Sequence, residues 1–131
     1  MKKSTLLNAP ASALVAEMGH TDMLTICDCG LPISDGPKRI DLALTFGTPT
    51  LPQTLETVLS ELKIEGAILA SEIIDVSPEM YKSILELLGD VKIEYVSHED
   101  FKKLTQSSRG IIRTGECTSF ANVILISGVA F

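Results

Sequence analysis

Four groups of polar residues could carry chemistry in this sequence. They are His20; Asp28; His98 with Lys102; and the run from Arg113 and Glu116 to Asn122. Imidazole and carboxylate groups are the usual general acids and bases near neutral pH, so these groups are the candidates for proton transfer. Each group also has a plainer interpretation. His20 could be a cap or surface residue, Asp28 and Asn122 turn residues, and His98 a helix start. Arg113 and Glu116 could be an ordinary surface ion pair worth ~0–1 kcal/mol.

The residues around His20 and Asp28 predict a helix, a strand and a turn in succession. Asn8 favours a helix start, and apolar residues then recur at helical spacing. Gly19 is expected to end this helix as a left-handed C-cap. A buried strand is expected over 23–27, so His20 lies just before that strand and Asp28 just after it. Our hypothesis is that the two residues share one polar site, in which Asp28 orients His20.

Helices and strands are expected to alternate along the rest of the chain. Further helices are predicted over 50–62, 78–88 and 97–104, and further strands over 39–44, 67–70, 91–96 and 110–113. The apolar run 123–131 is expected to be docked, either in a central strand or at a subunit contact. Such alternation is typical of an α/β fold with a largely parallel sheet flanked by helices, and we expect residues 1–131 to form a single domain. Ligands bind at strand ends in such sheets, which makes the polar groups there site candidates.

The two histidines are predicted at helix ends of opposite polarity. His20 follows a helix C-terminus, where the macrodipole favours imidazolium, and His98 opens a helix, where it favours neutral imidazole. Each effect is modest, ~0.3–1 kcal/mol. The opposite signs would suit one histidine for giving a proton and the other for taking one.

Composition argues against several classes of protein. The net charge is −6 without a cluster of lysines or arginines, and there is no tryptophan, so a nucleic-acid partner is not expected. No apolar run reaches the ~18 residues of a membrane span, and no signal peptide is recognised, so we expect a cytoplasmic protein with reduced cysteines.

Motifs for cofactors are missing from the sequence. Cys27, Cys29 and Cys117 form no recognisable zinc pattern with the two histidines, and no glycine-rich phosphate loop is present, so neither a metal nor a cofactor is predicted. The mean hydropathy of +0.28 is high for so small a chain and indicates apolar surface buried between subunits.

Six short motifs, weak singly, together resemble a known family. They are Gly19-His20-Thr21-Asp22, Asp28-Cys29-Gly30-Leu31-Pro32-Ile33, Arg39-Ile40-Asp41-Leu42-Ala43, Ser97-His98-Glu99-Asp100-Phe101-Lys102, Ile112-Arg113-Thr114-Gly115-Glu116 and Ala121-Asn122. In this order they resemble the D-ribose pyranase family, whose close relatives are the L-fucose mutarotases, over nearly the whole chain.

The resemblance implies a cytoplasmic, cofactor-free isomerase that interconverts the pyranose and furanose forms, and the anomers, of free D-ribose. It also implies a ring-shaped decamer of two stacked pentamers, with each site between neighbouring subunits. The implied residues are His20 as proton donor and, as sugar-binding residues, Asp28, His98, Phe120, Ala121 and Asn122, with Lys102 as a weaker candidate and His98 also as a possible partner base.

Departures from the family pattern leave two alternatives open. Phe120 stands where the family usually has tyrosine, which removes a hydroxyl contact worth ~0.5–1.5 kcal/mol. Cys27 and Cys29 flank Asp28 where the family usually has alanines. The alternatives are a mutarotase of another monosaccharide, such as L-fucose, and a non-catalytic sugar-binding protein of the same fold.

Overall fold

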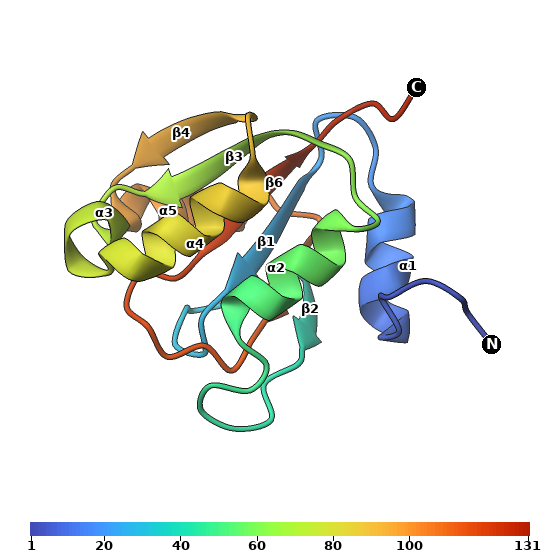
Figure 1. Cartoon of the computed structure of the whole chain (residues 1–131), viewed down its shortest axis with the longest axis horizontal. Coiled ribbons are helices and arrows are strands. Elements are labelled where there is room, and N and C mark those ends of the chain that lie inside the picture. The colour runs from blue at the N-terminus through green and yellow to red at the C-terminus, as the bar shows by residue number, and fades with distance from the viewer.

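Six strands form one mixed sheet at the centre of the structure, a computed structural model that describes residues 1–131 (Figure 1). They are β1 (Met23–Cys27), β2 (Lys38–Asp41), β3 (Ile64–Ala70), β4 (Lys92–Val96), β5 (Gly110–Arg113) and β6 (Val123–Ser127). Their order across the sheet is β2-β5-β1-β6-β3-β4. All neighbouring pairs are parallel except those of β6, which runs antiparallel to β1 and β3. The predicted α/β fold with a largely parallel sheet is confirmed.

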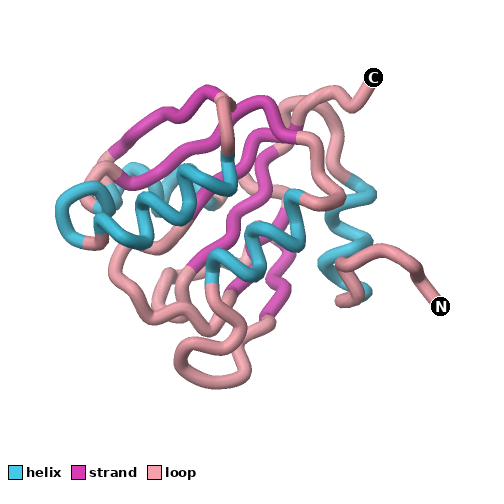
Figure 2. Tube along the Cα trace, in the orientation of Figure 1, coloured by secondary structure: helices cyan, strands magenta, loops and turns pink.

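Helices cover both faces of this sheet (Figure 2). They are α1 (Ala9–Glu17), α2 (Leu51–Leu59), α3 (Ile73–Val76), α4 (Pro78–Leu88) and α5 (His98–Thr105). The larger apolar core lies between one face and α1, α2 and α4. A smaller core lies on the other face, where Phe101 of α5 is completely buried with Ile111 and Ile124. In Figure 1, α2 and α4 lie in front of the sheet and α5 lies behind it.

Polar side chains cap three of the helices where the sequence predicts a helix start. The Asn8 side chain accepts the backbone N–H of Ala11 at 3.0 Å, and Thr50 accepts that of Gln53 at 3.2 Å. Ser97 does the same for the first turn of α5. Such caps typically stabilise a helix by ~1 kcal/mol, so they fix where these helices begin.

The prediction for Gly19 is wrong. Helix α1 ends in extended backbone at Met18, with φ −68° and ψ 122°, and Gly19 does not adopt a left-handed conformation. The chain turns instead at Thr21, whose φ is 68°. The Asp22 carboxylate accepts the Gly19 N–H at 2.8 Å and closes this turn, so a side-chain contact replaces the expected glycine cap.

Further elements differ from the expectation: β3 begins at Ile64 rather than at residue 67, and β6 ends at Ser127 rather than at residue 131. Strand β2 ends at Asp41 rather than at residue 44, because the Asp41 carboxylate accepts the N–H of Ala43 and bends the backbone. Helix α3 was not predicted, since its four residues are too few for a periodic pattern. These differences lie at element ends and in a connection and leave the sheet unchanged.

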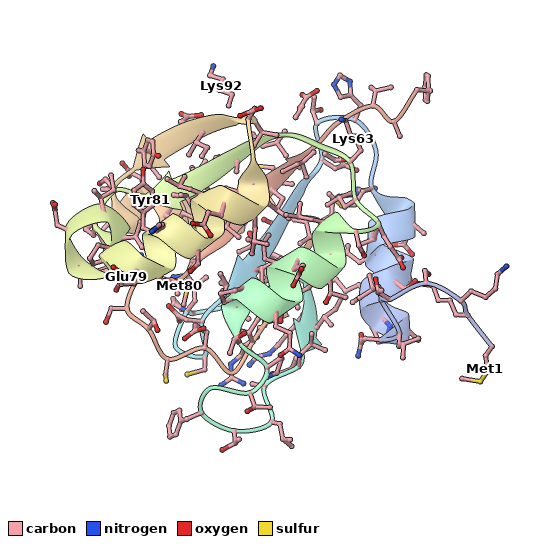
Figure 3. All side chains as sticks on the ribbon, viewed as in Figure 1. Met1, Lys63, Glu79, Met80, Tyr81 and Lys92 are labelled. Carbon is pink, nitrogen blue, oxygen red and sulfur yellow. The ribbon has the colours of Figure 1, made fainter.

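The apolar run at the end of the chain supplies a central strand, which is one of the two placements expected of it. Strand β6 lies between β1 and β3, and residues 128–131 continue beyond it. At one sheet edge, β4 exposes Lys92, Glu94 and Tyr95, and the Lys92 side chain extends away from that edge (Figure 3). Charged residues on an edge strand oppose pairing with other chains. None of the helices combines the length and the apolar character needed to cross a membrane.

Candidate functional site

A cleft of about 390 Å³ opens at the carboxyl ends of β1 and β4. Its lining residues are Asp28, Gly30, Leu31, Pro32, His98, Lys102, Ser119 and Phe120. Asp28 directly follows β1, and His98 begins the helix after β4. Because β6 is antiparallel to its neighbours, the loop before it, with Ser119 and Phe120, reaches the same end of the sheet. The topology thus gathers residues from three distant parts of the sequence.

Asp28 is held in place by Asn122. The Asn122 amide oxygen accepts the backbone N–H of Asp28 at 2.8 Å, and its amide nitrogen donates to the Asp28 carboxylate at 2.9 Å. The same carboxylate accepts the Gly30 N–H at 2.9 Å. Asn122 is completely buried, and Ala121 beside it is buried too. In this chain Asn122 therefore acts on the cleft by fixing the Asp28 carboxylate.

His98 lies at the start of α5 between two aromatic rings. Its ring stacks on Phe101 at a centroid distance of 6.4 Å and meets Phe120 edge-on at 5.0 Å. The Glu72 carboxylate accepts the His98 backbone N–H, with both oxygens at 3.0 Å, and this bond lowers the pKa of Glu72. Nδ1 of His98 is buried without a partner. The aromatic contacts therefore fix the ring while leaving its polar atoms uncommitted.

Phe120 and Lys102 complete two walls of the cleft. Phe120 has a φ of 61°, an uncommon conformation for a non-glycine residue, and its carbonyl accepts the Asn122 N–H at 2.8 Å. Lys102 pairs with Glu99 at 2.6 Å, an interaction that lowers the pKa of Glu99. The cleft thus presents a carboxylate, an imidazole and an ammonium group beside an aromatic ring.

His20 lies at the other end of the sheet from Asp28. It precedes β1 whereas Asp28 follows it, and the four residue steps from Met23 to Cys27 alone span roughly 13 Å. The His20 side chain is 55% exposed, and its Nε2 lies 2.9 Å from a carboxylate oxygen of Glu65. The hypothesis that Asp28 orients His20 is wrong within one chain, because the rigid strand holds the two residues apart.

The interpretation of Arg113 and Glu116 as a surface pair is also wrong. Arg113 donates to the Cys29 carbonyl and pairs with Asp41 at 3.0 Å. Glu116 is buried and accepts the N–H of Leu51 and the hydroxyl of Thr118. Glu116 thus joins the loop after β5 to the start of α2, and Arg113 joins the end of β2 to the loop after β1.

The Cys27 thiol next to Asp28 is unreactive at neutral pH. Cys27 is completely buried, and burial, followed by the nearby Asp28 charge, raises its pKa to about 12. The thiol therefore stays protonated at neutral pH and packs as a small apolar group. The three cysteines are unpaired.

Sequence reasoning missed two carboxylates that hold the histidines. Glu65 bonds the His20 ring, and Glu72 bonds the His98 backbone. Glu65 is the one charged residue in an otherwise apolar strand, a signal that could have marked it. Glu72 carried no signal, because α3 itself was not predicted.

The fold and the cleft place this chain among small α/β proteins with a polar cleft at the carboxyl ends of parallel strands. Here a carboxylate and an imidazole line that cleft. Comparison with known proteins then gives the family. The model of the RbsD / FucU transport protein family matches residues 1–130, and the chain belongs to this family.

Individual relatives match the chain over its full length. A D-ribose pyranase of Vibrio vulnificus (strain YJ016) is 54% identical, with both chains fully covered. The structure of Bacillus subtilis RbsD complexed with D-ribose superposes with a TM-score of 0.96 at 43% identity, again over both full chains. The fucose mutarotase of Streptococcus pneumoniae in complex with L-fucose shares the fold, with a TM-score of 0.87 at 22% identity and both chains fully covered.

Proposed function

We propose that residues 1–131 act as one D-ribose pyranase domain, which interconverts the pyranose and furanose forms and the anomers of the free sugar. The observation that carries the proposal is the Asp28 carboxylate, fixed by Asn122 and facing the same cleft as His98. Support comes from the full-length match to a D-ribose pyranase and from the likeness to a ribose-bound structure.

The reaction requires proton transfers and no other chemistry. A base takes the proton of the anomeric hydroxyl while an acid protonates the ring oxygen, and the bond from C1 to the ring oxygen breaks. The open aldehyde rotates about its C1–C2 bond, and either the O4 or the O5 hydroxyl adds to C1. That hydroxyl returns its proton, and the carbonyl oxygen gains one. Well-placed acids and bases contribute ~10²–10⁴-fold each to such steps.

In this proposal, several residues of the chain carry out the proton transfers and bind the sugar. His20 donates the proton to the ring oxygen. Asp28 accepts hydrogen bonds from sugar hydroxyls, and His98 binds the sugar or acts as the partner base. Phe120 and the main chain of residues 120–122 contact the sugar, with Lys102 at the rim. The aromatic wall beside His98 suits the apolar face of a sugar ring.

An assembly of several copies would bring His20 to this cleft. Because β1 separates His20 from Asp28 within one chain, the proposal places His20 of a neighbouring subunit over the cleft of the next. We propose a decamer of two stacked pentamers with sites between subunits, located in the cytoplasm. The exposed Leu44 and Phe46 are among the apolar residues available for contacts between copies.

Ring exchange of ribose, read by saturation-transfer NMR, tests the activity. The His20→Ala variant should lose the exchange above the uncatalysed rate, while its circular dichroism spectrum and melting temperature stay near wild type, since His20 is exposed. Retention of full exchange in His20→Ala would defeat its role as proton donor.

Mixing two inactive variants tests where the site lies. When His20→Ala and Asp28→Asn subunits are refolded together, a site between subunits regains activity wherever an intact His20 meets an intact Asp28. Random assembly gives about a quarter of the sites this composition. No recovery would overturn the proposal that His20 of one subunit and Asp28 of its neighbour share a site. As a control, a mixture of His20→Ala with wild-type subunits shows how much activity remains when the subunits are mixed by the same refolding procedure.

A panel of monosaccharides in the same assay separates the alternatives. Faster exchange for ribose than for L-fucose supports the proposal. Faster exchange for another sugar makes the chain a mutarotase of that sugar. Chemical-shift changes on sugar binding without faster exchange mean a sugar-binding protein.

A further inference from the structure

We propose that Glu65 is the positioning residue for the proton donor: it holds Nε2–H of His20 and leaves Nδ1 to exchange the proton with the sugar. This inference rests on the proposed function. The contact itself is short, with 2.9 Å between Nε2 of His20 and the Glu65 carboxylate. It joins residues 45 positions apart, so neither residue meets the other through a local turn.

A β-bulge directs Glu65 towards His20. In the pairing of β3 with β6, Ile64 lies opposite Ser127 and Gly66 lies opposite Ile126, which leaves Glu65 as an extra residue. A bulge of this kind re-aims a side chain that regular pleating would send elsewhere. The backbone is tightly packed here, since a Cβ at Gly128 would lie 3.1 Å from the Glu65 nitrogen. The carboxylate is therefore presented by fixed backbone.

The turn that carries His20 is fixed to the same end of β6. Thr21 adopts a φ of 68°, an unusual conformation for a β-branched residue, and its N–H donates to the Ser127 carbonyl at 2.9 Å. The Ser127 N–H in turn donates to the Asp22 carbonyl at 2.9 Å. Strand β6 lies between β1 and β3, so it holds His20 from one side and Glu65 from the other.

The chemical consequence concerns the tautomer of the ring. A carboxylate accepts only from a protonated nitrogen, so Glu65 selects the tautomer with hydrogen on Nε2. Nδ1 then carries the lone pair in the neutral ring and the transferable proton in the imidazolium. A second group that fixes the tautomer and orientation of a catalytic histidine is a general arrangement in acid–base sites. Without it the exposed ring samples other rotamers and the second tautomer.

Variants of Glu65 separate positioning from charge. Glu65→Ala removes the acceptor, and we expect kcat for ribose exchange to fall about tenfold or more with KM little changed, because in this proposal Glu65 acts through the His20 ring. Glu65→Gln keeps an acceptor oxygen at the same reach and should retain most of kcat. Glu65→Asp keeps the charge but withdraws it by one methylene, so kcat should fall here too. Glu94→Ala, which removes an exposed carboxylate from the same surface hollow, should leave kcat unchanged.

The tautomer of His20 gives a readout that does not depend on activity. Long-range ¹H–¹⁵N NMR should show the Nε2–H tautomer for neutral His20 in the wild type and in Glu65→Gln, and a mixture of tautomers in Glu65→Ala. Wild-type kcat and an unchanged tautomer in Glu65→Ala would overturn the inference. If the wild-type protein instead does not catalyse ribose exchange, the proposed function is wrong. The tautomer measurement then decides by itself whether Glu65 fixes the tautomer of the His20 ring.

Discussion

The contact between Asn122 and Asp28 supports the most direct test of the cleft. Asn122→Ala removes one hydrogen bond to the Asp28 N–H and one to its carboxylate. A neutral bond contributes ~0.5–1.5 kcal/mol and a bond to a charged group ~1.5–3 kcal/mol. We therefore expect the free energy of unfolding, measured by urea denaturation, to fall by ~2–4 kcal/mol.

The same substitution should also impair ribose exchange. Without the amide, the Asp28 carboxylate loses its fixed orientation towards the cleft, and the sugar has to restore that orientation on binding. Because ~1.4 kcal/mol corresponds to a tenfold change, loss of the charge-assisted bond predicts a fall in kcat/KM of ~10- to 100-fold. Saturation-transfer NMR at several ribose concentrations gives kcat/KM.

A second asparagine provides the matched control. Asn8 caps α1 away from the cleft, so Asn8→Ala should lower stability by ~1 kcal/mol and leave kcat/KM unchanged. Asn122→Asp sharpens the test, since it keeps the acceptor for the Asp28 N–H but sets a second carboxylate against the first, and its activity should fall at least as far as that of Asn122→Ala. Wild-type kcat/KM in the folded Asn122→Ala protein would refute the reasoning.

Two further predictions concern stability. Glu116 accepts hydrogen bonds from the Leu51 N–H and from Thr118 while buried, so Glu116→Ala should lower the free energy of unfolding by ~2–4 kcal/mol in urea titrations, and a change below the error of the titration would contradict this. Partial burial raises the pKa of Asp41, but bonds from Arg113 and Ala43 outweigh it, and the net pKa is lowered. A lowered pKa stabilises the fold above the pKa of the unfolded chain, so the stability difference between wild type and Asp41→Asn, at most ~1 kcal/mol at pH 7, should vanish as the pH falls through the folded-state pKa. A difference that does not shrink at all as the pH is lowered below the pKa of the unfolded chain, measured in thermal melts, would exclude this origin.

The elements of this fold were predictable where local chemistry decides them. Strand β1 has the predicted bounds because an apolar run stands between two polar turns, and α5 begins at His98 because Ser97 can cap it. The predicted glycine cap at Gly19 does not form, because the Asp22 carboxylate accepts the Gly19 N–H and closes the turn. Gly19 and Asp22 compete for the same turn, and the local sequence pattern does not specify which of them closes it.

The long-range contacts of the site were not predictable from spacing. Asn122 and Asp28 lie 94 positions apart and meet because β6 enters the sheet antiparallel beside β1. Nothing in the apolar pattern of 123–131 specifies that direction. For the same reason the sequence pattern favours a surface position for Glu116. In the structure, the loop around Glu116 folds over the start of α2 and Glu116 is buried.

The separation of His20 from Asp28 constrains how copies of the chain could share a site. Within a two-fold dimer, two equivalent clefts form when each subunit offers His20 to the other, whereas a head-to-tail contact repeats around a ring. Both arrangements restore activity in mixed variants, so that experiment alone does not choose between them. The mass of the assembly does, because a two-fold contact alone closes at a dimer and a head-to-tail contact closes at a larger ring. Native mass spectrometry of the wild type therefore distinguishes the two stacked pentameric rings of the proposal from a dimer, and loss of exchange on dilution to monomers shows that the site needs more than one copy.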